Sequence, residues 1–158
     1  MFDLKYLKSQ TVLFVEDEEV AREILAKVLS KMFKNVITAS NGLEAYEKFE
    51  RASLSSDKID LIISDINMPI VNGLDMLENI RKIDNFVPAI FVTARSETSN
   101  ILRAIDLNVT NYIIKPVQMD IMLSKIKEAC EKKYIRKQLD EKKEELENYL
   151  EAVDTVAS

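Results

Sequence analysis

Residues 11–15 read TVLFV, a short run of β-branched and aromatic residues that leads directly into Glu16 and Asp17. The run is apolar at every position, which is typical of a strand buried on both faces of a parallel sheet. Beyond the acidic residues, apolar side chains recur every three or four positions, which predicts a helix with an apolar stripe. That stripe comprises Val20, Ile24, Leu25, Val28, Leu29 and Met32.

The alternation of strand and helix continues along the chain. Further strand-like runs are residues 36–39, 59–65, 88–92 and 112–114, and helical patterns cover residues 43–52, 73–83 and about 98–107. Ser96 and Thr98 are candidate N-caps of the last of these helices, and Asn108 is suited to a left-handed C-cap. Five strands alternating with helices predict an α/β fold, in which helices cover both faces of a parallel sheet through right-handed crossovers.

The composition narrows the possible functions. The chain has 158 residues, a formal net charge of −5, no histidine and one cysteine, Cys130. Its length fits one domain, and 47% hydrophobic residues exclude a disordered chain. The absence of histidine excludes His-based metal sites and Ser-His triads. The acidic balance argues against nucleic-acid binding, and the absence of a long apolar run or signal peptide predicts a cytoplasmic protein without a membrane partner.

The segment after Pro116 contains neither glycine nor proline and predicts one long helix. Its first part carries a core-facing stripe of Met119, Met122, Leu123, Ile126 and Cys130. Its second part carries a heptad seam of Ile135, Leu139, Lys142, Leu146, Tyr149, Val153 and Val156. We therefore divide the chain into a lead-in at 1–10, a domain at 11–130 and a coiled-coil linker at 131–158. The alternative is a solvated terminal helix that frays at its end.

Residues with chemistry stand where four of the predicted strands end. Glu16 and Asp17 follow the first strand, Asp65 ends the third, Thr93 follows the fourth and Lys115 follows the fifth. Ligands of open parallel sheets bind beyond the carboxyl ends of the strands, so we expect these side chains to converge. Carboxylates without histidine or cysteine favour Mg²⁺ or Mn²⁺. A cation, a lysine and a hydroxyl around a free carboxylate suit a phosphoryl group, which the carboxylate attacks.

Each of these residues alone has an ordinary explanation. An acidic pair after a strand is usually a helix cap, a lysine before a proline is usually a surface residue, and a threonine at a strand end is usually a cap or a core-edge hydroxyl. The specificity lies in the combination of acids, hydroxyl and lysine on four strand ends. A dimerisation module with inert carboxylates, or a phosphatase with an aspartate nucleophile, also remains open. Such phosphatases place the nucleophile in an Asp-x-Asp pair on the first strand, whereas Asp65 lies on the third.

Five motifs closely resemble the receiver domain of two-component response regulators. They are VLFVED at 12–17, LIISDINMP at 61–69, NGL at 72–74, VTA at 92–94 and NYIIKP at 111–116. The resemblance covers residues 10 to 130 and implies a flavodoxin-like sheet of strand order 2-1-3-4-5, followed here by a long C-terminal helical extension.

The resemblance also implies roles for particular residues. Asp65 would be the phosphoacceptor, while Asp17 would ligate Mg²⁺ directly and Glu16 through water. The backbone carbonyl of Asn67 would complete the protein ligands of the metal. Thr93 and Lys115 would contact the phosphoryl group. Tyr112 would change rotamer together with Thr93, and the bond between Lys115 and Pro116 is often cis in this family.

The implied function is a phosphorylation switch and not an enzyme with turnover, apart from self-catalysed phosphoryl transfer and autodephosphorylation. The phosphodonor partner would be a histidine kinase or a phosphotransfer protein. We expect a homodimer through the face formed by the fourth helix, fifth strand and fifth helix, together with the C-terminal helix. The chain is expected to be a fragment of a larger response regulator, hybrid sensor kinase or diguanylate cyclase.

Overall fold

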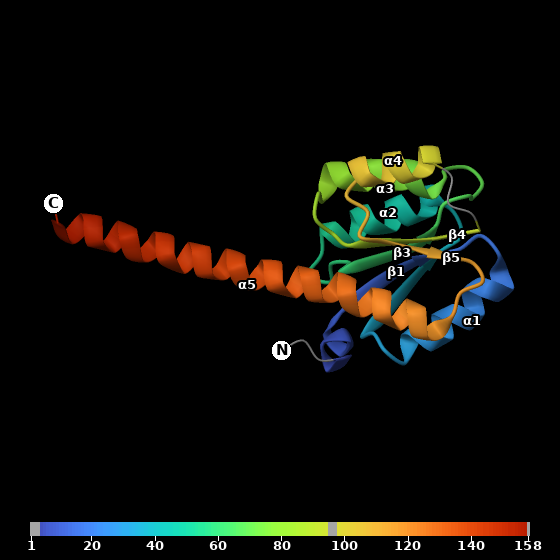
Figure 1. The fold of residues 1–158 in the computed structure, drawn as a ribbon, viewed down its shortest axis with the longest axis horizontal. Coiled ribbons are helices and arrows are strands. Elements are labelled where there is room, and N and C mark those ends of the chain that lie inside the picture. Colours follow the sequence, from blue (N-terminus) through green and yellow to red (C-terminus); the bar gives the residue numbers. More distant parts are fainter. Residues whose placement is uncertain (1–3, 95–97, 158) are drawn as a thin grey trace.

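The computed structural model describes residues 4–94 and 98–157. Its sheet contains five parallel strands in the order β2-β1-β3-β4-β5, as the resemblance implied (Figure 1). The strands are β1 (Thr11–Val15), β2 (Asn35–Ala39), β3 (Leu61–Asp65), β4 (Ala89–Thr93) and β5 (Asn111–Ile114). β1, β3 and β4 are buried at every position, because helices cover both of their faces.

The helices form one layer on each side of the sheet (Figure 1). They are α1 (Glu19–Ser30), α2 (Gly42–Ser53), α3 (Gly73–Ile83), α4 (Thr98–Asp106) and α5 (Met119–Ala157). α2, α3 and α4 pack on one face, and α1 and the first part of α5 pack on the other. The sequence therefore predicted the fold class correctly. Of the candidate caps for α4, Ser96 lies outside the described residues.

Asparagine side chains start two of the helices. Asn41 Oδ1 accepts the backbone N–H of Glu44 at 2.9 Å, and Asn72 Oδ1 accepts that of Asp75 at 2.9 Å. Glu18 caps α1 in the same way, by accepting the N–H groups of Val20 and Ala21. These bonds satisfy donors that a helix start leaves without partners. At the end of α4, Asn108 has a φ of 57°, which confirms the predicted left-handed C-cap.

α1 forms as predicted, and its apolar stripe is only partly buried. Leu29 is fully buried, but Val20 and Ile24 are 60% and 62% exposed. Only the C-terminal part of α1 presses its apolar side chains onto the sheet. Its N-terminal turns border the carboxyl edge, and Ile24 lines a cleft there. The apolar pattern of α1 therefore includes surface residues beside the functional edge of the sheet.

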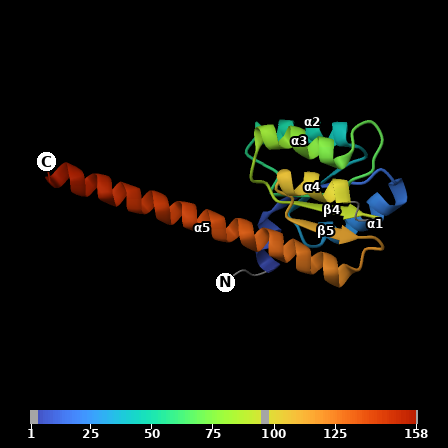
Figure 2. The same ribbon diagram turned by 45° about the horizontal axis from the view of Figure 1, so that its top comes forward.

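α5 is a single helix of 39 residues, as predicted. Its first part packs on the compact domain formed by the sheet and its helices, which we call the body, and its second part extends into solvent. Met122, Ile126 and Cys130 are buried in the body, while Met119 is 37% exposed. The C-terminal part of α5 projects away from the rest of the molecule as far as its last residue, Ala157 (Figures 1 and 2). No helix within the described residues has the length and hydrophobicity needed to cross a membrane.

Three contacts fix α5 at the point where it leaves the body, and we call them the exit contacts. The Lys133 ammonium bonds Asp60 Oδ1 at 2.9 Å, the Tyr134 ring meets the Tyr6 ring edge to face at 5.5 Å, and the Arg136 guanidinium lies 3.5 Å from the centre of the Phe86 ring. Tyr6 belongs to a 3₁₀ helix, Leu4–Ser9, whose Leu7 is 1% exposed. The lead-in thus packs against both the body and the beginning of the projecting segment.

Candidate functional site at the carboxyl edge of the sheet

Two neighbouring strands bring three acidic side chains together. β1 and β3 pair with Val15 opposite Ser64, so Glu16 and Asp17, which follow β1, lie beside Asp65, the last residue of β3. One carboxylate oxygen of each residue lies within 4.8 Å of those of the other two. Glu16 and Asp65 are buried, at 8% and 7% exposure, and Asp17 is exposed. The structure therefore brings together the three acids that the strand ends predicted.

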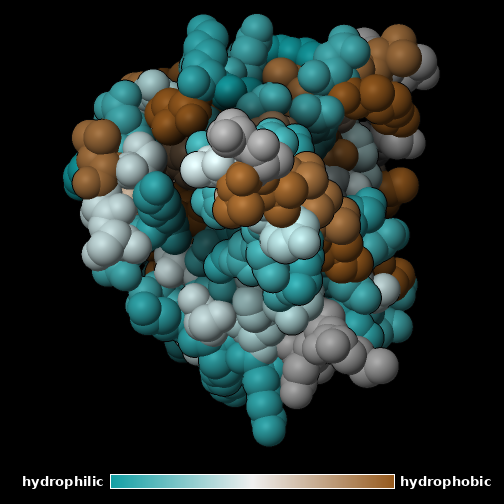
Figure 3. Space-filling model, turned by 90° about the vertical axis from the view of Figure 1, so that its left-hand side faces the viewer, coloured by the Kyte–Doolittle hydropathy of each residue, from teal (hydrophilic) through white to brown (hydrophobic). Residues whose placement is uncertain are grey.

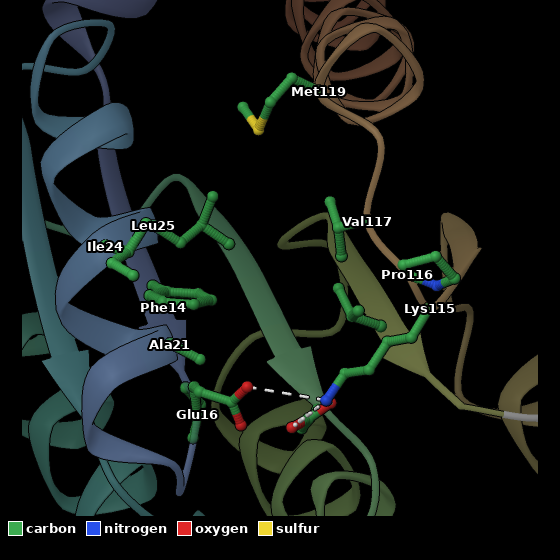
Figure 4. A pocket seen from close by; sticks show the side chains of 12 residues that line it. Phe14, Glu16, Ala21, Ile24, Leu25, Lys115, Pro116, Val117 and Met119 are labelled. Atoms are coloured by element: carbon green, nitrogen blue, oxygen red, sulfur yellow. Dashed lines mark hydrogen bonds and ion pairs between the residues drawn. The ribbon is translucent and has the colours of Figure 1, made fainter.

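Lys115 supplies the positive charge at this site. It follows β5, and its bond to Pro116 is cis, as the resemblance implied. Its Nζ lies 3.0 Å from each carboxylate oxygen of Asp65 and 3.6 Å from Glu16 Oε1. Figure 4 shows the Lys115 side chain extending toward the side of the site where Glu16 lies, with a dashed line joining the two. One ammonium therefore faces a group of three carboxylates.

Burial and the neighbouring charges together shift the protonation equilibria of the site. Burial, followed by the hydrogen bond and the charge of Asp65, raises the pKa of Glu16 above its ordinary value. Burial and the hydrogen bond with Glu16 raise the pKa of Asp17. Burial opposes the charged form of Lys115, but its bonds and charge interactions with Asp65 and Glu16 outweigh this effect and raise the pKa of Lys115. The acids repel one another even with the lysine in place.

The donor set fits a small hard cation. Glu16 Oε2 is buried and makes no hydrogen bond, so a carboxylate oxygen with strong acceptor capacity remains available at the centre of the group. Oxygen ligands from carboxylates, with water at the remaining positions, suit Mg²⁺ or Mn²⁺. A divalent cation among Glu16, Asp17 and Asp65 would offset both the cost of burying these carboxylates and the repulsion between them.

The other predicted residues occupy positions around this group. Thr93 ends β4 and is 3% exposed, and the backbone N–H of Lys115 donates to its carbonyl at 2.8 Å. Tyr112 lies on β5, and its hydroxyl donates to the carbonyl of Asn100 in α4 at 3.0 Å. Asn67 is exposed in the loop two residues after Asp65. Thr93 therefore lies at the carboxyl end of β4, beside the strand that ends in Asp65, whereas Tyr112 connects β5 to α4.

The loop after Asp65 depends on two glycines at helix starts, and the sequence did not predict how closely they approach neighbouring backbone atoms. A Cβ atom on Gly73 would lie 2.2 Å from the carbonyl oxygen of Asp65, and one on Gly42 would lie 2.4 Å from that of Val71. Both helix starts therefore approach the loop more closely than any side chain permits. In the same loop, Ile70 has a φ of 70°, a left-handed conformation that costs a β-branched residue about 1–2 kcal/mol. The signal available in the sequence was that the chain has two glycines only.

An apolar cleft of about 410 Å³ adjoins the charged group. It lies between α1 and the start of α5, and Figure 4 shows Phe14, Ile24, Leu25 and Met119 around it. Asp65 and Lys115 line the same cleft. The reactive edge of the sheet is therefore continuous with an apolar surface that another molecule could cover.

The fold and the site define a signalling module of the two-component type. Residues 12–127 match the response regulator receiver domain family. Because this match spans most of the chain, the chain belongs to the response regulator receiver domain family.

Individual relatives agree with this membership. The chain is 36% identical over 121 residues to a probable transcriptional regulator, ycf29, of Porphyra purpurea, covering 75% of this chain and 56% of the relative. It is 30% identical over 118 residues to the chemotaxis protein CheY1 of Helicobacter pylori, covering 73% of this chain and 92% of that protein. Among solved structures, the N-terminal domain of an uncharacterized protein from Wolinella succinogenes has a TM-score of 0.72 and 30% identity, covering 81% of this chain and 99% of that domain.

Proposed function

We propose that Asp65 accepts a phosphoryl group from a phosphohistidine of a histidine kinase or phosphotransfer protein. One observation carries this assignment. The Asp65 carboxylate stands at the carboxyl edge of the sheet, 3.0 Å from Lys115 Nζ and within 4.8 Å of two further carboxylates. Family membership supports the same function, because receiver domains are phosphoacceptors of two-component systems. The chain would act as a switch with self-catalysed transfer and autodephosphorylation, not as an enzyme with turnover of a separate substrate.

The residues present can perform the transfer in one displacement. An oxygen of Asp65 attacks phosphorus in line, the bond between phosphorus and the histidine nitrogen breaks, and that nitrogen keeps the electron pair. The Lys115 ammonium, already beside Asp65, neutralises charge on the phosphoryl oxygens. The Thr93 hydroxyl, at the end of the neighbouring strand, can donate to another of them. Asp17, Glu16, Asp65 and the backbone carbonyl of Asn67 would hold Mg²⁺, or Mn²⁺, which supplies further charge neutralisation when bound.

The switch would pass through Tyr112. A phosphoryl group on Asp65 draws the Thr93 hydroxyl toward it and leaves space into which the Tyr112 ring can turn. The hydroxyl of Tyr112 now holds the backbone of α4 at Asn100, so this rotation would release that contact and let the surface formed by α4, β5 and α5 repack.

The cleft beside Asp65 supports docking of the phosphodonor. Ile24 of α1 is exposed and lines this cleft together with Glu16 and Asp65, and Val20, one turn earlier on α1, is exposed as well. A helix carrying the phosphohistidine could lie across it and bring the phosphorus within reach of Asp65. The apolar cleft that binds the phosphodonor would then lie directly beside Asp65, the acceptor of the phosphoryl group.

Two further expectations complete the proposal. Two copies would associate through the α4, β5 and α5 surface together with the C-terminal helix. Residues 1–10, 11–130 and 131–158 would act as lead-in, receiver and helical linker to an output module, in a cytoplasmic protein that binds neither membrane nor nucleic acid through this segment.

Acetyl phosphate or beryllofluoride with Mg²⁺ tests the acceptor. Intact-mass measurement after acetyl phosphate should show one added phosphoryl group in the wild type and none in Asp65→Asn. Asp60→Asn is the matched control, because Asp60 lies at the opposite edge of the sheet, where it bonds Lys133. An unmodified wild type, or phosphorylation that persists in Asp65→Asn, would overturn the assignment.

A further inference from the structure

The face of α5 that carries the heptad seam is turned away from the body. Met122, Ile126 and Cys130, which are buried, lie about 150° around the helix from Ile135 and Leu146 at 100° per residue. The six apolar seam residues between Ile135 and Val156 are 44–88% exposed. These exposed fractions show that the seam is accessible along its whole length. Figure 3 views the molecule from the free end of α5, where hydrophobic and hydrophilic residues lie side by side on the surface.

An exposed seam of this kind needs a covering partner. Residues 135–156 of α5 are all exposed. In proteins, most helical stability comes from packing of an apolar face and not from helix propensity, so this segment lacks that packing within one chain. Apolar residues at alternating spacings of three and four are the pattern that pairs helices with a slight left-handed supercoil. The pattern repeats on every copy of the chain, so a second copy carries a matching seam.

The charges beside the seam select the orientation of that second copy. With Leu139 and Leu146 at position a of the heptad, the basic residues Arg136 and Lys143 occupy position e. The acidic residues Glu131 and Glu145 occupy position g. Parallel helices place g beside e of the partner five residues further along, whereas antiparallel helices place e beside e and g beside g. In the parallel arrangement Glu131 faces Arg136 of the partner subunit, while Lys143 faces the partner's Gln138 and Glu145 faces the partner's Leu150, so no like charges oppose each other. The antiparallel arrangement brings like charges together at e and at g.

We propose that two copies of this chain pair in parallel and in register through the α5 seam from Ile135 to Val156. This inference rests on the dimer part of the proposed function and is independent of phosphorylation at Asp65. Glu131 then faces Arg136 of the partner subunit. The Arg136 guanidinium carbon lies over the Phe86 ring, and a guanidinium can stack on a ring while its N–H groups donate to a carboxylate at its edge.

Lys142 forms the weak layer of this pairing. It occupies position d, where its ammonium lies 3.6 Å from Glu145 Oε2 of its own helix. Two lysines meet at this layer in the parallel dimer, and each keeps its own acidic neighbour. A charged layer inside a seam reduces affinity and disfavours higher oligomers, so we expect a two-stranded and reversible dimer.

The first test measures mass by light scattering over a range of concentrations. The wild-type chain should be a concentration-dependent dimer, Lys142→Leu should tighten it by about tenfold or more, and Leu146→Lys should leave a monomer. Glu144→Lys is the control, because Glu144 faces the body side of the helix. A wild type that is monomeric at every concentration, or trimeric, would overturn the proposal. Leu146→Lys should still take one phosphoryl group at Asp65, which separates failure of this proposal from failure of the acceptor assignment.

Disulfide cross-linking tests the orientation. Cys130 is the single native cysteine; it is buried, and burial raises the pKa of its thiol to about 12, so it should not react in the folded chain. Under mild oxidation Leu139→Cys should form a covalent dimer, whereas Glu144→Cys should not. In an antiparallel pair Leu139 would face the distal end of the partner. A dimer in which Leu139→Cys fails to cross-link with itself but does so with Val156→Cys would therefore contradict the parallel arrangement.

Discussion

The two edges of the sheet gather similar charged groups and use them differently. At the amino edge, Asp60 accepts the Thr11 N–H at 2.8 Å and the Lys133 ammonium at 2.9 Å. At the carboxyl edge, Lys115 faces three carboxylates, and Glu16 Oε2 makes no hydrogen bond. Matched charges hold segments of the chain together, whereas an excess of one sign creates an affinity for a ligand of the other sign.

The largest effect should come from removing the lysine at the carboxyl edge. Lys115→Ala should lower the rate of phosphorylation by acetyl phosphate by about 100-fold or more, because the transferring phosphoryl oxygens lose a positioned positive charge. The rate is measured by intact mass against time at saturating Mg²⁺.

Lys133→Ala is the matched control, because it removes a lysine from the acid of the other edge. It should leave the rate of phosphorylation unchanged and lower stability, since Asp60 and the exit of α5 lose a contact. Equal losses of rate in the two variants would show that the two edges do not differ in function.

The next largest effect, on stability, should come from Arg81, which bonds backbone carbonyls of loops at the amino edge. Its guanidinium donates to the carbonyl oxygens of Leu107, Asp84, Val87 and Asn108 at 2.7–3.3 Å. Arg81→Met should lower the free energy of unfolding by about 3 kcal/mol, because several partly buried carbonyls lose their donor. Urea denaturation measures the loss.

Arg51→Met provides the comparison, since Arg51 is exposed in the last turn of α2. We expect a change below about 0.5 kcal/mol there. Mg²⁺ affinity, measured by calorimetry, should be unaltered in both variants, and a marked loss of affinity in Arg81→Met would contradict the separation of the two edges.

The smallest effect has the opposite sign. Asp17→Asn removes one of three converging acids, so the metal-free protein should gain up to about 1 kcal/mol of stability at neutral pH. The same change should weaken Mg²⁺ binding by at least about tenfold, because a carboxylate ligand is lost. Denaturation in chelator and calorimetric titration measure the two quantities. A destabilised metal-free variant would argue that these acids are structural.

Most of the site could be predicted because parallel strands deliver residues to a common edge. Glu16, Asp65 and Lys115 are far apart in the chain, yet each directly follows or ends a recognisable strand, so the topology brings them together. The pairing of Lys115 with both acids follows from that geometry.

Other features could not be predicted because they depend on shape instead of pattern. The apolar spacing of Val20 and Ile24 matches that of core residues, and only the position of α1 relative to the sheet edge shows that they are exposed. The contact between Tyr6 and Tyr134 joins opposite ends of the chain, which no local pattern reveals. The close approach of Gly73 to Asp65 likewise appears only in three dimensions.

The length of α5 turns small movements into large ones. At about 1.5 Å per residue, the 21 residues from 137 to 157 reach about 32 Å beyond the exit contacts. A rotation of about 5° at the exit would sweep the free end through roughly 3 Å, a distance comparable to the length of a hydrogen bond. A rotation of α5 about the exit contacts is therefore amplified at its free end. The displacement of that end for a given rotation increases with the number of residues that extend past the exit contacts.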